Sequence, residues 1–516
     1  MNPVLIILPQ GASIGGVTTW AITLANALAA ERRPVTLLIH GAIDHHASVP
    51  LKLHPGVNAI HRPDLPSPQS LAGQLKSVTN AYRDAINAIS LKGLGPVLLI
   101  PTRDADCFGV CAALAQDDPA RVRLVGWRHS PMPYEREIFR VFGPSMSRII
   151  GVSQWLCDHM RRSLPTCADR VACVPNAVDV PLSRPRRRPV NGRPIELVYT
   201  GRLDDAIKRT GALPLLSDAL TQMAIAHRLT IIGDGPALST LQAAAASRAS
   251  LRLLGVHSPH DVAAALAASD VFVLPSRIEG LSLSALEAMA QGCALAITRT
   301  PSGASDLIGD GSCGCLADAS PEDDDATTAQ ALTCAVQSLL ARDLDAAGRA
   351  AHARALAHFS IKTMVRHAIE ELGRAATDPP ITAQAAMPII FHDRTRPASV
   401  PADAENRLAR ILHSLAGRAI LIHGCGAHTR ALMSTILSSP ARIVGFADDD
   451  SAARSPDPLR FPVVLPAQAQ ATGATDVVLS SYLHEEVLWA RRDVYERQGI
   501  SVHRLYAADH PIKQPA

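Results

Sequence analysis

The sequence predicts an α/β protein with three units, each built around a parallel sheet. Short runs rich in leucine and β-branched residues alternate with alanine- and leucine-rich amphipathic stretches along almost the whole chain. The length of 516 residues corresponds to about three domains at about 150 residues each. Two stretches rich in proline, 182–194 and 377–404, break the alternation and indicate linkers.

The first unit, residues 1–185, begins the alternating pattern. A helix is expected over 17–30, and strands are expected over 4–8, 35–40, 97–101, 122–127, 148–152 and 170–174.

The second unit, residues 190–376, repeats the alternation and ends in a segment, 326–376, that is mostly helical by pattern. Strands are expected over 195–200, 229–232, 251–254, 271–274 and 294–298, and helices over 238–246, 259–268 and 284–291. The third unit, residues 405–512, follows the linker 377–404. Its strands are expected over 419–423, 442–447, 477–480 and 501–505.

The composition excludes several classes of protein. With 47% hydrophobic residues, 50 Lys+Arg and 47 Asp+Glu, the net charge is +3 and the chain can bury large cores, so it is not disordered. So small a net charge gives no reason to expect a nucleic-acid partner. Aromatic residues make up only 3% of the chain, which also disfavours base-stacking surfaces.

The sequence also favours a cytoplasmic protein without a metal site. No apolar run approaches the roughly 18 residues of a membrane span, and the N-terminal segment MNPVLIILPQ lacks the basic and long apolar regions of a signal peptide. The ten cysteines are therefore expected to be reduced thiols. None forms a C-x-x-C pair, so we expect no zinc site. No D-x-D triplet precedes a strand end in the way a catalytic metal site needs, so we expect no catalytic metal, and nothing in the sequence indicates a cofactor.

The most specific motif lies at 271–292, where a buried apolar strand leads through a polar turn into a helix. The free N–H groups and positive dipole end at a helix N-terminus favour an anion such as a diphosphate. Gly280 allows a close backbone approach, while Glu279 in the turn and Glu287 in the helix can accept hydrogen bonds from sugar hydroxyls. A second interpretation is that Ser284 and Glu287 only form a capping box.

The segment VFVLPSRIEGLSLSALEAMAQG resembles the E-x7-E region of retaining glycosyltransferase family 4, whose enzymes have the GT-B fold. Other blocks are similar to that family in the same order: LVYTGRLDDAIKR, LTIIGDGPALSTL and, upstream, GVSQWLCDHM and VPNAVDV. The resemblance covers roughly residues 1–375. It implies two Rossmann-like domains that face a cleft, with the acceptor side in the first unit and the donor side in the second.

The resemblance also implies roles for residues of the second unit. Arg202 and Lys208 correspond to the basic pair that neutralises the donor diphosphate, although the adjacent Arg209 is an alternative to Lys208. Glu279 is expected to contact the donor sugar and Glu287 the ribose. The turn residues Gly280, Leu281 and Ser282 are expected to bind the donor.

Three residues of the first unit complete the expected site. Gly15 and Gly16 open a helix after the first strand, and the resemblance places this double glycine beside the donor phosphates. The alternative is an ordinary turn between strand and helix. His129 follows the strand over 122–127, where α/β folds place site residues, and the resemblance puts a histidine there near the donor sugar and the acceptor.

The third unit carries a weaker signal. The turn with Gly424 and Gly426 follows a strand, and Asp448 ends the next strand, which approximates a Rossmann nucleotide site without its third glycine. The unit resembles small Rossmann-like domains attached to sugar-modifying enzymes, such as sugar O-acyltransferases. A nucleotide or sugar ligand at Gly424, Gly426 and Asp448 is one interpretation, and a scaffold is the other.

The function implied by these motifs is a retaining, metal-independent hexosyltransferase. It would transfer a sugar from a nucleotide-diphosphate sugar to a glycan or lipid-linked acceptor, in polysaccharide or glycoconjugate biosynthesis. The alternative is a non-catalytic scaffold or regulator that binds nucleotide sugars. The basic stretches Arg161-Arg162 and Arg184–Arg188 leave peripheral contact with an anionic membrane as a minority hypothesis.

Overall fold

The computed structural model describes most of the chain. The described residues are 2–12, 15–41, 51–71, 75–90, 95–185, 192–381, 404–426, 428–429, 432–437, 439–449, 461–481 and 485–506.

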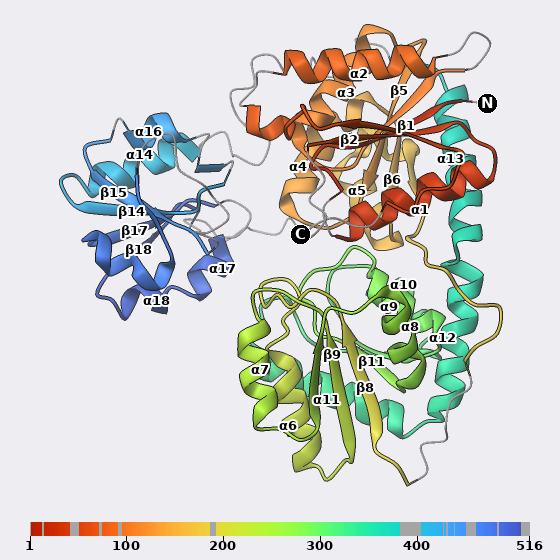
Figure 1. Cartoon of the computed structure of the whole chain (residues 1–516), viewed down its shortest axis with the longest axis vertical. Coiled ribbons are helices and arrows are strands. Elements are labelled where there is room, and N and C mark those ends of the chain that lie inside the picture. Colours follow the sequence, from red (N-terminus) through yellow and green to blue (C-terminus); the bar gives the residue numbers. More distant parts are fainter. Residues whose placement is uncertain are drawn as a thin grey trace. The chain divides into compact units, whose positions relative to one another are not determined.

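Seven parallel strands form the first sheet in the order β3-β2-β1-β4-β5-β6-β7 (Figure 1). Their bounds are β1 Val4–Leu8, β2 Val35–His40, β3 Val57–Arg62, β4 Val97–Pro101, β5 Val122–Arg128, β6 Met146–Gly151 and β7 Val171–Cys173. The α-helices of this region are α1 Gly16–Ala30, α2 Lys76–Ile89, α3 Ala105–Asp117, α4 Pro133–Phe142 and α5 Gln154–Ser163. Short 3-10 helices lie at η1 Pro68–Leu71, η2 Gly143–Ser145 and η3 Pro165–Arg170.

Six parallel strands form the second sheet in the order β10-β9-β8-β11-β12-β13. Their bounds are β8 Ile195–Thr200, β9 His227–Ile232, β10 Leu251–Gly255, β11 Val271–Leu274, β12 Ala294–Thr298 and β13 Gly314–Ala317. The helices are α6 Ala212–Gln222, α7 Leu238–Ala246, α8 Pro259–Ala268, α9 Leu283–Ala290, α10 Ala304–Ile308, α11 Asp325–Leu340 and α12 Leu344–His358.

The third sheet has five parallel strands in the order β16-β15-β14-β17-β18, with the strand order reversing between β14 and β17. Their bounds are β14 Ala419–His423, β15 Arg442–Ala447, β16 Val463–Val464, β17 Asp476–Leu479 and β18 Ser501–Arg504. The helices are α14 Ala404–Ser414, α16 Met433–Leu437, η4 Pro466–Thr472, α17 Glu485–Ala490 and α18 Asp493–Glu496.

The chain divides into two compact units. The first comprises 1–64, 82–102 and 111–388, and therefore holds the first two sheets. The second comprises 65–81, 103–110 and 389–516, and holds the third sheet.

The central strands are buried because a parallel sheet is covered on both faces. All residues of β1, β2, β4, β5 and β6 are buried, and β1 reads as the continuous apolar run VLIIL. Edge strand β3, with the sequence VNAIHR, instead mixes exposed and half-buried residues.

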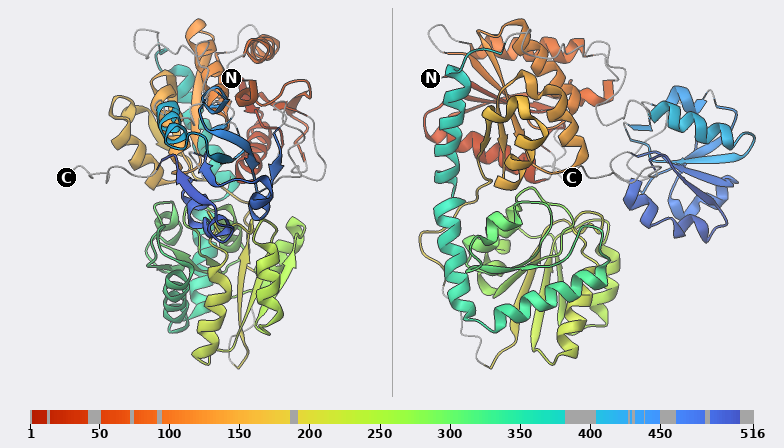
Figure 2. Two further views of the ribbon diagram at one scale, coloured as in Figure 1. Left: turned by 90° about the vertical axis from the view of Figure 1, so that its left-hand side faces the viewer. Right: turned by 180° about the vertical axis from the view of Figure 1, so that it is seen from behind.

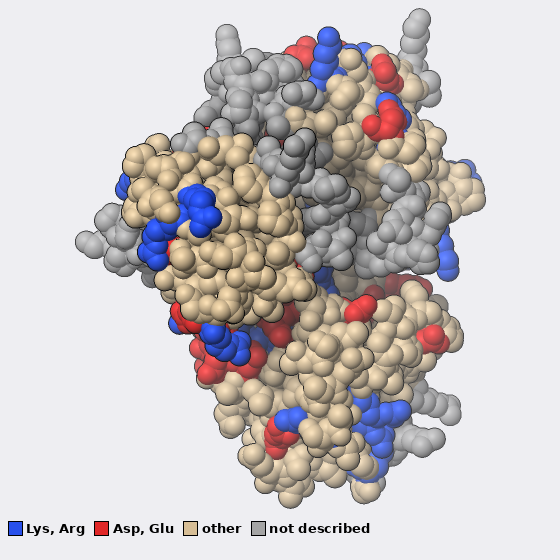
Figure 3. Space-filling model, turned by 60° about the vertical axis from the view of Figure 1, so that its left-hand side comes forward, with Lys and Arg blue, Asp and Glu red and all other residues tan. Residues whose placement is uncertain are grey.

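The face of the molecule drawn in Figure 3 carries small groups of both charge signs, in agreement with the small net charge.

Helix α13, Ile361–Thr377, follows the second sheet in sequence but packs against α1 and strands β4–β6 of the first sheet (Figure 2). A buried ion pair holds it there: Glu371 accepts hydrogen bonds from Nε and Nη2 of Arg148 in β6, at 2.9 and 2.5 Å. Both side chains are 9% exposed. The chain therefore passes between the two sheets twice, once on the way out and once on the return.

The outgoing segment is bound to the returning one. The Val178 amide donates to the Phe359 carbonyl at 3.0 Å, beside an isolated parallel bridge between Val178 and Ser360. A ring nitrogen of His352 lies 2.8 Å from the Pro181 carbonyl oxygen. The two passages thus form one hydrogen-bonded connection.

The predicted fold class is confirmed, since all three sheets are parallel and alternate with helices. Helices α7 and α8 and strands β8, β11 and β12 have the predicted bounds. Strands β3 and β13 were not predicted. Half of the residues of β3 are polar, and β13, with the sequence GCLA, contains no β-branched or aromatic residue. The linker prediction falls partly on 186–191 and 382–403, which lie outside the described residues. The domain limits expected from the sequence, 1–185, 190–376 and 405–512, remain a prediction.

Candidate active site

The predicted site residues lie where parallel strands end. Loops at the carboxyl ends of β1 and β5 carry Gly15 and His129, and loops after β8 and β11 carry Arg202 and Glu279. This edge is where open α/β sheets bind ligands.

Lys208 and Glu279 meet in an ion pair. The Lys208 ammonium lies 2.5 Å from Oε1 of Glu279, and the Ser276 hydroxyl donates to the same oxygen at 2.8 Å. Both charged side chains are mostly buried, with exposures of 23% for Lys208 and 14% for Glu279. The turn thus holds a fixed carboxylate beside a fixed cation.

The two neighbouring arginines have different surroundings. Arg202 is 68% exposed, and its Nε lies 3.7 Å from the Asp204 carboxylate, so its guanidinium can bind a ligand. Arg209 is fully buried and donates to the carbonyls of Ser320 and Pro321 at 2.7 and 2.9 Å. Arg209 is therefore a structural residue, and Lys208 is the cation that faces the site.

Helix α9 begins at Leu283, and its N-cap is Ser282, whose hydroxyl accepts from the Ala285 amide at 3.3 Å. The alternative capping box of Ser284 and Glu287 is wrong, because the cap lies two residues earlier and Glu287 is the fifth helical residue. The carboxylate of Glu287 is free of that structural role.

Two helix N-termini converge at this point. A Cβ atom built on Gly16, the first residue of α1, would lie 3.6 Å from Cδ1 of Leu283, the first residue of α9. The first turns of both helices, with their unpaired N–H groups and positive dipole ends, therefore lie next to each other. Such a region favours an anion.

Gly280 touches the loop that follows β5 in the first sheet. A Cβ atom at this position would lie 1.7 Å from the His129 carbonyl oxygen, so only glycine fits. The Gly280 carbonyl in turn accepts from the Gly303 amide at 2.8 Å. The turn after β11 and the loop after β5 are thus in direct backbone contact, as the predicted roles of Gly280 and His129 require.

The loop at His129 is held by Glu135 at the start of α4. One carboxylate oxygen of Glu135 accepts from the amides of His129 and Ser130 at 2.9 and 2.8 Å, and the other accepts from the Ser130 hydroxyl at 2.9 Å. Desolvation raises the pKa of Glu135 above its ordinary value, against the hydrogen bonds that lower it. The His129 ring packs edge-on against Trp20 with centroids 4.4 Å apart.

Glu287 is exposed to solvent, yet the surrounding protein raises its pKa to about 7. An accessible carboxylate with so much protein around it lies on a concave surface. The cause of the shift is desolvation. This group can change charge near neutral pH.

Two further residues join the domains next to the site. The Asn176 side-chain amide donates to the Leu281 carbonyl at 2.9 Å, and the Asp306 carboxylate accepts from the Gln154 amide at 2.5 Å. Asn176 thus binds the donor-side turn directly, although the sequence gives no reason to single it out. An asparagine on a short loop carries no signal of such a distant partner.

In the third sheet, Asp448 binds the glycine turn itself. Its Oδ2 accepts from the Cys425 amide at 2.9 Å, and the residue is 8% exposed. A ligand at Gly424, Gly426 and Asp448 stays a prediction.

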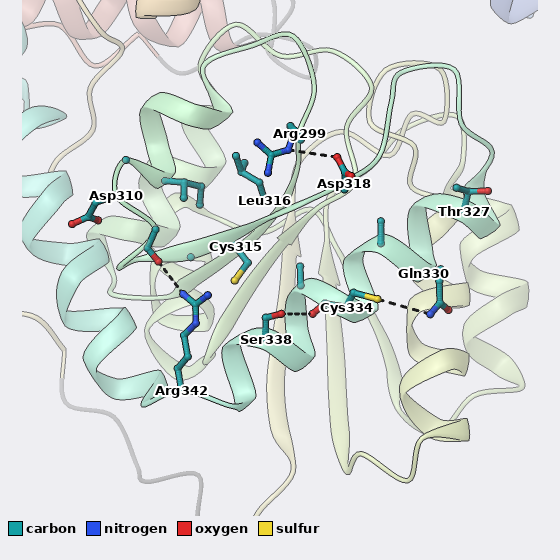
Figure 4. A pocket seen from close by; sticks show the side chains of 16 residues that line it. Arg299, Asp310, Cys315, Leu316, Asp318, Thr327, Gln330, Cys334, Ser338 and Arg342 are labelled. Atoms are coloured by element: carbon teal, nitrogen blue, oxygen red, sulfur yellow. Dashed lines mark hydrogen bonds and ion pairs between the residues drawn. The ribbon is translucent and has the colours of Figure 1, made fainter.

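A pocket with a volume of about 900 Å³ lies elsewhere, along β13 and α11 (Figure 4). Its labelled polar side chains include Arg299, Asp318, Gln330 and Arg342. None of the predicted site residues lines it.

The described part of the chain was compared with the requirements of a metal site and of a membrane-spanning helix, and it meets neither. No group of three or more His, Cys, Asp or Glu side chains there could hold a metal ion. No described helix is both long and apolar enough to cross a bilayer. Of the basic stretches, Arg161 pairs with Asp158 at 2.9 Å and Arg184 with Asp345 at 2.5 Å, while 186–188 lie outside the described residues.

Two family models match adjoining stretches of the chain. Residues 14–181 match the model described as Glycosyltransferase Family 4, and residues 194–340 match the model described as Glycosyl transferases group 1. Among curated proteins, no sequence matches the chain.

Several solved structures share the fold. The pneumococcal O-GlcNAc transferase GtfA, in complex with UDP and GlcNAc, is 12% identical with a TM-score of 0.58, over 73% of this chain and 99% of its own. Sucrose-phosphate synthase from Thermosynechococcus elongatus is 19% identical with a TM-score of 0.55, over 72% and 98%. The lipopolysaccharide outer core galactosyltransferase WaaB is 15% identical with a TM-score of 0.54, over 72% and 99%.

The matched stretches coincide with the first two sheets, whose loops form the site described above. The family-model matches and the fold together identify the chain as a glycosyltransferase of the GT-B fold.

Proposed function

We propose that the chain transfers a sugar from a nucleotide-diphosphate sugar to a glycan or lipid-linked acceptor, with retention of the anomeric configuration. The observation that carries the proposal is the Lys208–Glu279 ion pair beside the converging N-termini of α1 and α9. Similar folds bind such donors, since the GtfA structure contains UDP and GlcNAc.

The diphosphate fits the positive region of the site. Negative charge develops on the leaving diphosphate as its bond to the sugar breaks, and fixed cations and helix N-termini stabilise that charge. Lys208 and the exposed Arg202 supply the cations, while Gly15, Gly16 and Ser282 lie at the helix ends. Glu287 accepts hydrogen bonds from the ribose when it is ionised.

The Glu279 carboxylate orients the donor sugar by accepting hydrogen bonds from the sugar's hydroxyl groups. The Glu279 carboxylate oxygen that faces the site is already engaged by the Lys208 ammonium at 2.5 Å and the Ser276 hydroxyl at 2.8 Å. The acceptor hydroxyl therefore gives its proton to the departing diphosphate oxygen. The bond from the acceptor oxygen to the anomeric carbon forms on the face where the bond to phosphate breaks, which retains the configuration.

Further parts of the proposal rest on the motifs alone. The positive groups of the site can neutralise the diphosphate, so we propose that the reaction needs no metal. We place it in polysaccharide or glycoconjugate biosynthesis in the cytoplasm, with peripheral membrane contact and a ligand in the third domain as open predictions.

The test is a panel of UDP-, GDP- and ADP-sugars incubated with the full chain, with and without acceptors and with and without EDTA. Nucleotide release and anomeric proton NMR of the product measure turnover and stereochemistry. An α-linked product from an α-linked donor, formed equally with EDTA, is expected. Donor binding without turnover in any combination would instead favour a non-catalytic scaffold that binds nucleotide sugars.

A further inference from the structure

A cationic patch adjoins the site on the first domain. It comprises one residue from the end of β5, one from α4 and three from α5: Arg128, Arg136, Trp155, His159 and Arg162. The three α5 residues are spaced i, i+4 and i+7, so they share one helix face. The rings of Trp155 and His159 stack with centroids 5.2 Å apart and planes 7° apart.

The exposed arginines of the patch have no acidic partner among the described residues. Neighbours on the same helices do: on α4, Arg140 pairs with Glu137, and on α5, Arg161 pairs with Asp158. No ion pair is formed by Arg136 or Arg162 within the described part of the chain. Their charges are therefore available to a ligand.

The charges act together on His159. Burial lowers the pKa of His159 below its ordinary value, and Arg128, Arg136 and Arg162 lower it further in that order. Every charged group that shifts this imidazole is a cation. The cations therefore outweigh the nearby acidic groups in their effect on His159.

Arg128 provides a second, independent observation. The residue is 1% exposed, its Nε donates to the Ser130 carbonyl at 3.0 Å, and its buried Nη2 has no hydrogen-bond partner among the described residues. Burial lowers the pKa of Arg128 to about 10, and the negative charge of Glu135 opposes that shift. The Glu135 oxygens are already engaged by the 129–130 loop. A buried N–H without an acceptor is unfavourable and is satisfied by an oxygen of a ligand.

The patch begins one residue from the site. Arg128 precedes His129, whose carbonyl contacts Gly280 of the donor-side turn. A group bound on the patch therefore belongs to the molecule that meets the donor from the first domain, which is the acceptor.

We propose that the patch binds an anionic group of the acceptor, a phosphate or a carboxylate, while the Trp155–His159 stack supports the adjoining sugar ring. This proposal rests on the proposed function and names its acceptor class. Guanidinium groups match the oxygen geometry of both anions. A discrete anion is favoured over a membrane surface, because the patch begins one residue from His129, whose carbonyl contacts Gly280 of the donor-side turn.

The experiment compares acceptors that differ only in charge: glucose, glucose 6-phosphate and glucuronic acid. The variants are the double substitution R136Q/R162Q and the matched control R140Q/R161Q, which removes the paired arginines of the same helices. We expect wild type and control to prefer the anionic acceptors by about 10- to 100-fold in kcat/KM, and R136Q/R162Q to lose that preference. Nucleotide release without acceptor should be equal in all three proteins.

Equal use of charged and neutral sugars by wild type, or a preference that survives in R136Q/R162Q, overturns the proposal. Direct binding of glucose 6-phosphate and glucuronic acid by NMR decides the matter when no transfer occurs. Binding lost in R136Q/R162Q alone then supports the patch even though the proposed transfer reaction has failed. The proposal is also refuted if wild type shows no preference for the soluble anions but co-sediments with phosphatidylglycerol vesicles, and R136Q/R162Q does not. That result would assign the patch to membrane contact.

Discussion

The contact between Gly280 and the first domain yields the sharpest prediction. In the variant Gly280→Ala, the new Cβ atom would lie 1.7 Å from the His129 carbonyl oxygen and 2.7 Å from its carbon. Real Cβ atoms essentially never come within 3.0 Å of such atoms, so the two loops must separate by about 1.3 Å, from 1.7 to 3.0 Å. Both colliding atoms belong to the backbone, so no side-chain rotation relieves the contact. The φ angle of Gly280 is not in the left-handed region, which makes the effect purely steric.

A displacement of about 1 Å between groups that position a substrate costs about 100-fold in rate, equal to about 2.7 kcal/mol of transition-state stabilisation. We therefore expect kcat of Gly280→Ala to fall by at least that factor in the transfer assay, while the melting temperature changes little. The control is Gly373→Ala in α13, where nothing lies within 4 Å of the added methyl group. That variant should keep full activity and gain about 0.5–1 kcal/mol of stability. Wild-type kcat and KM in Gly280→Ala would refute the assigned role of this contact.

Three further predictions follow from the ion pairs and the exposed carboxylate. Lys208→Ala should lower kcat/KM by about 100- to 1000-fold and lower the melting temperature less than Arg209→Ala, which should mainly affect stability; the reverse pattern contradicts the division between them. Desolvation raises the pKa of Glu287 to about 7, and the proposed function has its ionised form bind ribose, so donor affinity measured by calorimetry should rise from pH 6 to pH 8 and become pH-independent in Glu287→Gln. If donor affinity depends on pH in the same way in the wild type and in Glu287→Gln, ribose binding by Glu287 is excluded. Glu371→Gln leaves the buried Arg148 guanidinium with only the more distant Asp378 carboxylate, 3.8 Å away, and should lower the free energy of unfolding in urea by about 3 kcal/mol, the lower end of the range for a broken buried pair; a loss below 1 kcal/mol would show that the pair contributes little.

Much of the fold was predictable because its signals are local. A run such as VLIIL in β1 is apolar throughout, since both faces of a parallel strand are covered. The bounds of α7 and α8 likewise follow from their own sequence patterns, and α8 begins directly after the N-cap Ser258. Edge strand β3 was missed for the same reason, because its half-exposed residues lack that pattern.

The site was predictable only in part. Glu279 and Lys208 were each identified from their own motifs, but their contact joins residues 71 positions apart. The hydrogen bond from Asn176 to Leu281 spans 105 positions, and nothing near either residue indicates it. The motifs therefore predict which residues carry the chemistry, whereas their tertiary partners depend on how two sheets are brought together.

The hydrogen-bonded passages between the first two sheets limit how these domains can move. A single flexible linker would allow rotation about every axis, but two passages bound to each other by the Val178–Phe359 hydrogen bond act as one hinge. Rotation about that connection separates Gly280 from His129 and Gly16 from Leu283 together. The donor phosphates, the sugar and the acceptor loop would thus be engaged or released in a single step, so a ligand that tightens one of these contacts also tightens the others.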